Sequence, residues 1–85
     1  MYKKVVISTK GHDKDNIYIL LDDKNLLVDG KKKLLSNPKY KNKNHFEIIG
    51  EVWLKIHKDG LFRDVEIKRE IKLFKKNYKK KEDLS

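Results

Sequence analysis

The sequence predicts a mainly β domain, with a small barrel of about five antiparallel strands over residues 4–49, followed by one or two helices. Two observations support this fold class. Short apolar and β-branched runs recur through the first half of the chain, and Gly, Asn and Asp separate them, as is typical of strands joined by turns. The second half instead carries apolar residues at helical spacing. A helix longer than one turn between Val5 and Leu35 would contradict this prediction.

Turn-forming residues bound each predicted strand. The strands are expected at residues 5–8, 17–21, 26–28, 31–35 and 45–49. In the first of them, consecutive apolar residues indicate burial on more than one side. Asp13, in the polar loop that follows, is expected to bond loop backbone groups. Residues 36–44 are predicted as a loop, because Pro38 lacks an N–H and pushes Asn37 toward an extended conformation.

The C-terminal part begins with an ambiguous segment. Residues 51–58 fit two periods, because their apolar side chains alternate as in a strand, while Ile49, Trp53 and Ile56 fall at helical spacing. Residues 58–60 have the composition of a turn.

A longer helix follows that turn. Asp64 is expected to be the N-cap of a helix that runs to about Tyr78. One apolar stripe follows helical spacing along it: Ile67, Ile71, Phe74 and Tyr78. This organisation gives a barrel at 1–50, a helical extension packed on the barrel at 51–78, and a frayed basic tail at 79–85.

The charge balance points to a polyanionic partner. The chain has 22 Lys and Arg residues against 13 Asp and Glu, which gives a net charge of +9 and a pI near 9.7. Nucleic acid is the commonest partner of so basic a small protein. An alternative is that the charge only keeps the protein soluble. Clustering argues against that alternative, because residues 31–44 contain six lysines and no acid.

Several kinds of site are missing from the sequence. The chain has no cysteine, which excludes disulfides and thiolate metal sites. His12, His45 and His57 lack metal-ligand spacing, and neither a glycine-rich phosphate loop nor a Ser–His–acid order is present. We therefore expect a non-enzyme with no metal, no cofactor and no small-molecule substrate. The apolar runs are too short for a signal peptide or a membrane span, which predicts a cytoplasmic protein with no membrane partner.

An ordered set of motifs resembles a known family. Residues 5–14 read Val-x-x-Ser-x-x-Gly-x-Asp-Lys, and an apolar strand and Leu-Val-Asp-Gly at 27–30 follow. This pattern is similar to the KOW motif of ribosomal and transcription-elongation proteins. With Asn-Pro-Lys at 37–39 and Lys-Asn-His-Phe at 43–46, the chain resembles bacterial KOW-domain RNA-binding proteins related to a large-subunit ribosomal protein of archaea and eukaryotes. The family usually has Gly where this chain has Asp15, and often Arg where it has His12.

The resemblance implies an SH3-like barrel, and it favours a short helix over residues 51–58. It also implies binding to RNA, in particular ribosomal RNA, and action with the translation machinery, with ribosomal proteins as further partners. The alternative function is a protein-interaction module, in which the barrel and the C-terminal helix bind an acidic protein. Small barrels serve both purposes, so the fold alone does not decide between them.

The candidate RNA-binding residues are Lys10, Gly11, His12 and Lys14 in the first loop, Lys31, Lys32 and Lys33 at the start of the predicted fourth strand, and Lys39, Tyr40, Lys41 and Lys43 in the proline-containing loop. We expect the first loop and the proline-containing loop to form one basic edge around Tyr40. Its ring, flanked by two cations, either stacks on an unpaired base or folds back over the barrel. The lysines of the long helix are spread around a cylinder, and we expect them to contribute less.

Overall fold

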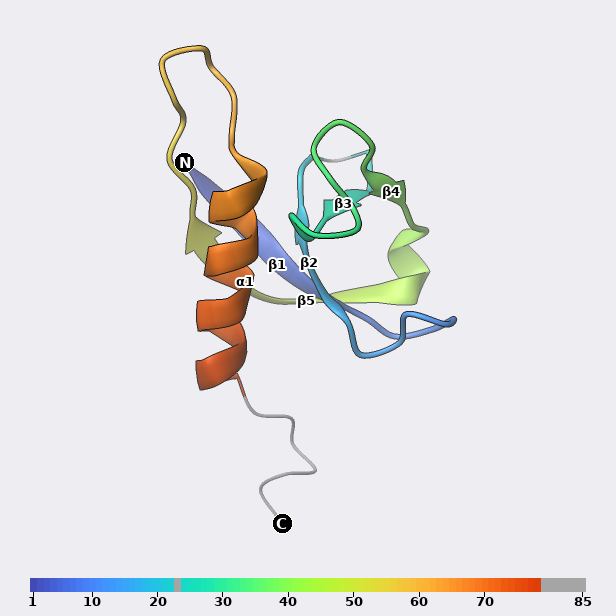
Figure 1. Ribbon diagram of the computed structural model, residues 1–85. Helices are drawn as coiled ribbons and strands as arrows, with labels where there is room; N and C mark the ends of the chain where they lie inside the picture. Colours follow the sequence, from blue (N-terminus) through green and yellow to red (C-terminus); the bar gives the residue numbers. More distant parts are fainter. Residues whose placement is uncertain (23, 79–85) are drawn as a thin grey trace.

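A computed structural model describes residues 1–22 and 24–78, and it confirms a mainly β fold with a C-terminal helix (Figure 1). The elements are strands β1 (Tyr2–Ser8), β2 (Ile17–Leu20), β3 (Leu26–Val28), β4 (Lys39–Tyr40) and β5 (Phe46–Trp53), the 3-10 turn η1 (Lys43–His45), and helix α1 (Asp64–Asn77). The strands form one open antiparallel sheet in the order β4-β3-β2-β1-β5. Across the described ranges, no helix is both long and apolar enough to span a bilayer.

Strand β1 lies between β2 and β5 in the sheet, and its two faces contribute to different cores. Val5 and Ile7 join the residues of α1 in one apolar cluster, which also contains Ile17, Ile19, Val28, Leu54, Ile67 and Ile71. Val6 points to the other face and packs with Tyr18 and Leu27. Adjacent strand residues face opposite sides of a sheet, so a strand covered on both sides needs consecutive apolar residues. The predicted burial of this strand on more than one side is confirmed.

The predicted fourth strand at residues 31–35 is wrong. That segment is a turn with one isolated bridge, between Leu34 and Asn37. Strand β4 forms later, inside the predicted proline loop, where Tyr40 pairs with Leu26. Two causes explain the shift. The backbone N–H groups of residues 31–33 already donate to the Asp29 side chain and cannot pair with a strand. Pro38 precedes β4, which is an edge strand, where a proline is tolerated.

The predicted short helix over residues 51–58 is also wrong. Strand β5 runs on to Trp53, which pairs with Tyr2, so the boundary placed at residue 50 falls inside a strand. The terminal amine of Met1 donates to the Leu54 carbonyl at 2.9 Å, and the Leu54 N–H donates to the Met1 carbonyl at 2.9 Å. The start of the chain therefore supplies the pairing partner that selects the strand period over the helical one.

The long helix is confirmed, with one correction at its start. Helix α1 begins at Asp64, which is its first helical residue and not its N-cap. Arg63 occupies the cap position without a side-chain cap hydrogen bond. The Asp64 carboxylate instead accepts a hydrogen bond from the Leu35 N–H at 2.8 Å, which ties α1 to the segment after β3. The predicted tail at 79–85 lies outside the described residues.

Candidate nucleic-acid interface

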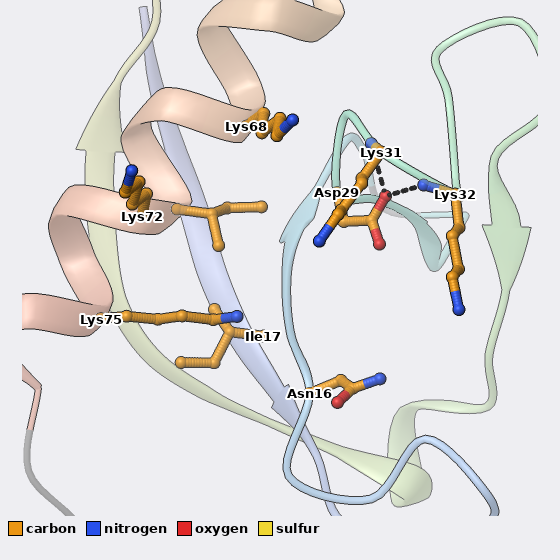
Figure 2. A pocket seen from close by; sticks show the side chains of 9 residues that line it. Asn16, Ile17, Asp29, Lys31, Lys32, Lys68, Lys72 and Lys75 are labelled. Carbon is orange, nitrogen blue, oxygen red and sulfur yellow. Dashed lines mark hydrogen bonds between the residues drawn. The ribbon is translucent and has the colours of Figure 1, made fainter.

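A cleft of about 350 Å³ separates helix α1 from the connection between β3 and β4 (Figure 2). Its lining combines lysines, two isoleucines and two other polar residues: Asn16, Ile17, Asp29, Lys31, Lys32, Lys68, Ile71, Lys72 and Lys75. The cleft is the place where the fold brings lysines of distant chain segments together.

Helix α1 supplies one wall of the cleft. Lys68, Lys72 and Lys75 follow i, i+4, i+7 spacing, which places them on one side of the helix. All three are exposed, and they lie beside Ile71, whose side chain belongs to the core. Figure 2 shows these lysines along the helix, across from the loop that carries Asp29, with Lys68 and Lys75 extending away from the helix toward the cleft. The apolar stripe that docks the helix therefore also sets the direction of this row of cations.

A tight turn supplies the other wall. One carboxylate oxygen of Asp29, Oδ1, accepts from the backbone N–H groups of Lys31, Lys32 and Lys33 at 2.9, 2.9 and 2.8 Å. The N–H groups of Asp29 and Gly30 donate to the Lys33 carbonyl at 2.9 and 3.2 Å. The backbone is thus folded around the aspartate, while the exposed side chains of Lys31 and Lys32 line the cleft (Figure 2).

Gly30 holds the two walls at a fixed separation. A Cβ at this position would lie 2.2 Å from the Asp64 carbonyl oxygen and 2.8 Å from the Lys68 nitrogen, so the turn touches the helix backbone directly. Its φ of +72° also favours glycine. Together with the Asp64–Leu35 hydrogen bond, this contact clamps the first turn of α1 to the segment after β3.

The floor of the cleft is apolar. Ile17 and Ile71 are 6% and 5% exposed, and the small exposed remainder of each faces the cleft between the two walls. Asn16 lies at the end of the floor, where the first loop enters β2 (Figure 2).

The charge of the lining is strongly positive. It holds five lysines and one carboxylate. Within residues 1–22 and 24–78, none of these five lysines forms a salt bridge. The Asp29 carboxylate uses one oxygen to bind three backbone amides. Lysines gathered in a concave site focus a positive potential that attracts anions.

Asp13 binds two of the lysines of the predicted loop edge. Its carboxylate forms ion pairs with Lys39 at 2.7 Å and Lys41 at 2.8 Å, and it also accepts from the hydroxyls of Ser8 at 2.9 Å and Tyr18 at 3.1 Å. Burial acts to raise the pKa of Asp13, but hydrogen bonds from Lys39, Lys41, Ser8 and Tyr18 outweigh it and hold the pKa far below its usual range. The bond to Asp13 likewise raises the pKa of Lys39.

Two of the predicted RNA-binding lysines therefore bind a carboxylate of the protein itself, and their contact with RNA stays a prediction. Lys41 is only 8% exposed, and its Nζ also donates to the Lys10 carbonyl at 3.0 Å. Lys39 is engaged by the same carboxylate. The expected role of Asp13 needs the matching correction, because its carboxylate binds side chains of β1, β2 and the β4 region and not loop backbone groups.

The other predicted residues of the loop edge are on the surface. Tyr40 is 64% exposed, so the alternative in which its ring folds back over the sheet is wrong. Lys10, Gly11, His12, Lys14 and Lys43 are all exposed. Lys33 is half-buried and does not line the cleft, whereas Lys31 and Lys32 do. RNA contact by these exposed residues stays a prediction.

Asp15 has a left-handed backbone conformation, at the position where the family that the chain resembles usually has glycine. Its φ is +75°, and its N–H donates to the Ser8 carbonyl at 2.8 Å. Aspartate tolerates this left-handed region better than most residues, although glycine adopts it without steric cost. The first loop thus keeps a left-handed residue here even though glycine is absent.

The helix lysines are the functional candidates that sequence reasoning placed last. Their signal is in the sequence: Lys68, Lys72 and Lys75 share one side of a helix and lie next to the apolar position Ile71. A lysine row that borders the docking stripe lies close to whatever the stripe packs against.

No protein-family model matches the chain, and comparison with curated proteins finds no match either. The KOW resemblance therefore rests on the residues quoted for it, and the argument for function rests on the cleft.

Proposed function

We propose that this protein binds RNA, and that the cleft between α1 and the β3–β4 connection is its main contact surface. The observation that carries the proposal is the pairing of the two walls: Lys68, Lys72 and Lys75 line one wall and Lys31 and Lys32 the other, and none of them forms a salt bridge with a described carboxylate. Lysine is a flexible point charge suited to phosphate oxygens, and phosphate contacts supply most of the affinity of such proteins for nucleic acid.

The KOW resemblance supports RNA as the polyanion, with ribosomal RNA and the translation machinery, including ribosomal proteins, as its cellular setting. It also supports an SH3-like barrel, in which η1 would bring the two edge strands β4 and β5 toward each other. Exposed Lys10, Lys14 and Lys43 would extend the contact beyond the cleft along the loop edge. Lys39 and Lys41 take no part, because Asp13 holds both.

The experiment measures RNA affinity against salt concentration by fluorescence anisotropy. Replacing Lys68, Lys72 and Lys75 by Ala should flatten the slope of log affinity against log salt by about two units, since each phosphate contact contributes about 0.7–0.9. The matched control replaces Lys24, Lys55 and Lys58, which are exposed and lie outside the cleft, and so removes the same charge. Equal flattening by both triple variants would show general attraction and would exclude the cleft.

A protein-interaction module remains the second candidate, and one observation favours it. Tyr2 and Trp53 are 66% and 59% exposed, and their rings meet edge-on at 5.1 Å on adjacent strands. Trp53 also lines a hollow with Glu66, Arg69 and Glu70, where the charges are mixed. Exposed aromatic residues with mixed charge are typical of protein interfaces. A pull-down after complete ribonuclease digestion tests it: a partner that survives digestion and is lost with Trp53→Ala supports this function.

A further inference from the structure

The shape of the cleft indicates which form of RNA enters it. Its walls carry lysines on both sides, from the helix and from the turn, so an anionic chain between them would meet cations in two directions (Figure 2). Its volume of about 350 Å³ is at the lower end of the range of small-ligand sites, which is about 300–1,000 Å³. The space is that of a small ligand, and a double helix is far larger.

The floor adds a second indication. Phosphates need only cations, whereas the floor between the two charged walls of the cleft is apolar. Ile17 and Ile71 belong to the core that docks α1, and each also leaves a small apolar area open to the cleft. A nucleobase has apolar faces and polar edges, so it could rest on the isoleucines while its edge reaches the Asn16 amide, which both donates and accepts.

A duplex does not offer these groups. In A-form RNA the bases are paired inside and the phosphates lie outside, and the major groove is too deep and narrow for side chains to read. A duplex would contact the lysines at the rims and leave the floor uncovered. An unpaired strand can turn a base inward while its phosphates reach both walls.

We propose that the cleft binds single-stranded RNA, with one unpaired nucleotide on the Ile17–Ile71 floor and the adjacent phosphates held by Lys31 and Lys32 on one side and by Lys68, Lys72 and Lys75 on the other. This inference rests on the proposed function and names the form of RNA that the site takes.

The test compares three polyanions at one salt concentration near 0.15 M, where charges well beyond a Debye length of about 8 Å are screened. The probes are an unstructured single-stranded RNA, a blunt RNA duplex of the same length, and inorganic polyphosphate of matched charge. We expect the single strand to bind at least about tenfold more tightly than the duplex, because contacts to the faces and edges of the bases are open only to the single strand. Polyphosphate should also bind more weakly, because it has nothing to place on the floor.

Two single variants test whether both walls act. Lys32→Ala and Lys72→Ala should each weaken single-strand binding about threefold, the average effect of one phosphate contact near physiological salt. Asn16→Ala should weaken single-strand binding about two- to tenfold and leave polyphosphate binding unchanged, since one hydrogen bond to the base is lost. The Asn16 N–H, which donates to the Asp13 carbonyl, is retained in this variant.

The outcomes separate the two proposals. Duplex binding as tight as single-strand binding, or polyphosphate binding as tight as RNA binding, overturns the single-strand inference while RNA binding by the cleft stands. An effect of only one of the two wall variants also overturns it, because the strand would then lie on one wall. If the variant that lacks Lys68, Lys72 and Lys75 binds RNA as well as the control variant that lacks Lys24, Lys55 and Lys58, the proposed function itself fails.

Discussion

Two aspartates, Asp13 between β1 and β2 and Asp29 after β3, interact with nearby lysines in different ways. Asp13 binds the ammonium groups of Lys39 and Lys41 directly and turns them into parts of the fold. Asp29 stands beside three lysines, yet its Oδ1 accepts their backbone N–H groups and leaves the side chains of Lys31 and Lys32 in the cleft. The available charge of a basic protein thus depends on what each carboxylate binds, and a count of lysines does not give it.

The difference has a local cause. The three amide donors of Asp29 follow it in the chain directly after Gly30, so a tight turn satisfies its carboxylate before any distant group can compete. Asp13 lies in a loop whose neighbours are Ser8 and Tyr18, and strand pairing brings β4 to it. The carboxylate of Asp29 is thus satisfied by sequence neighbours, and that of Asp13 by tertiary structure.

A large loss of stability is expected from Asp13→Asn. The change leaves two ammonium groups without their anion, and removing one partner of a buried ion pair costs about 3–5 kcal/mol. The Lys39 side chain is 31% exposed, so water compensates part of the loss, and we expect about 3 kcal/mol at pH 7. Urea denaturation followed by the fluorescence of Trp53 measures it. Asp29→Asn is the control: its amide oxygen can accept the same three N–H groups, and the loss should stay near or below about 1 kcal/mol.

Acid should reduce the difference between Asp13→Asn and the wild type. The folded state depresses the pKa of Asp13 below its usual value of 3.8, so the stabilisation is fully present above that value and is lost as the pH falls toward the folded pKa. Between pH 5 and pH 2 the wild type should therefore lose stability more steeply than Asp13→Asn. Denaturant midpoints at several pH values within this window measure the two slopes, and parallel slopes would contradict the role of Asp13.

Gly30→Ala tests the contact between the turn that holds Asp29 and the backbone of α1. A left-handed φ costs an alanine about 1–2 kcal/mol, and overlap with the helix backbone adds about 1–3 kcal/mol, so we expect a loss of roughly 2–5 kcal/mol. Gly60→Ala isolates the overlap, because Gly60 also has a positive φ of +78° but has nothing within 4 Å of the added Cβ. Equal losses in thermal unfolding would mean that the contact of Gly30 with α1 does not matter.

A matched pair of lysine variants separates stability from binding. Lys41→Met should cost about 2 kcal/mol, because hydrogen bonds to a charged group are lost, and should leave the salt slope of RNA affinity unchanged. Lys32→Met should change stability by less than about 0.5 kcal/mol and flatten the salt slope by about 0.7–0.9. The comparison between the two regions fails if Lys41→Met alters the slope as much as Lys32→Met.

The smallest effect concerns the left-handed residue of the first loop. Asp15→Gly should stabilise the protein by about 0.5 kcal/mol, because the relief of the positive φ slightly exceeds the entropy that glycine loses on folding. Denaturant unfolding with replicate midpoints can resolve this difference. A loss of stability would show that contacts of the Asp15 side chain outweigh its backbone conformation.

Elements whose evidence is local were predictable from the sequence. The apolar run of β1 and the stripe of α1 each identify their element, and the turn residues around 11, 22–25 and 30 separate the first strands. The errors fall where a distant partner decides. Strand β4 exists because Leu26 pairs with Tyr40, and β5 extends to Trp53 because the start of the chain pairs with it.

The candidate site follows the same rule. Lys31 and Lys32 were predictable as a dense basic cluster, and they do line the cleft. The row on α1 was not expected at this cleft, because a sequence does not say which side of a helix borders which loop. The ion pairs of Lys39 and Lys41 were not predicted either, because their partner, Asp13, is far from them in the chain.

The direct contact of Gly30 with α1 has a consequence for dynamics. The two walls come from distant parts of the chain, so a ligand that bridges them tethers the last helix to the sheet. Undocking of α1 would have to release that ligand, and linkage then adds RT ln(1 + [L]/Kd) to the free energy of opening. Bound RNA should therefore slow amide hydrogen exchange along α1 far more than in the loop around Gly11. The RNA would act as a reversible cross-link between α1 and the β3–β4 connection.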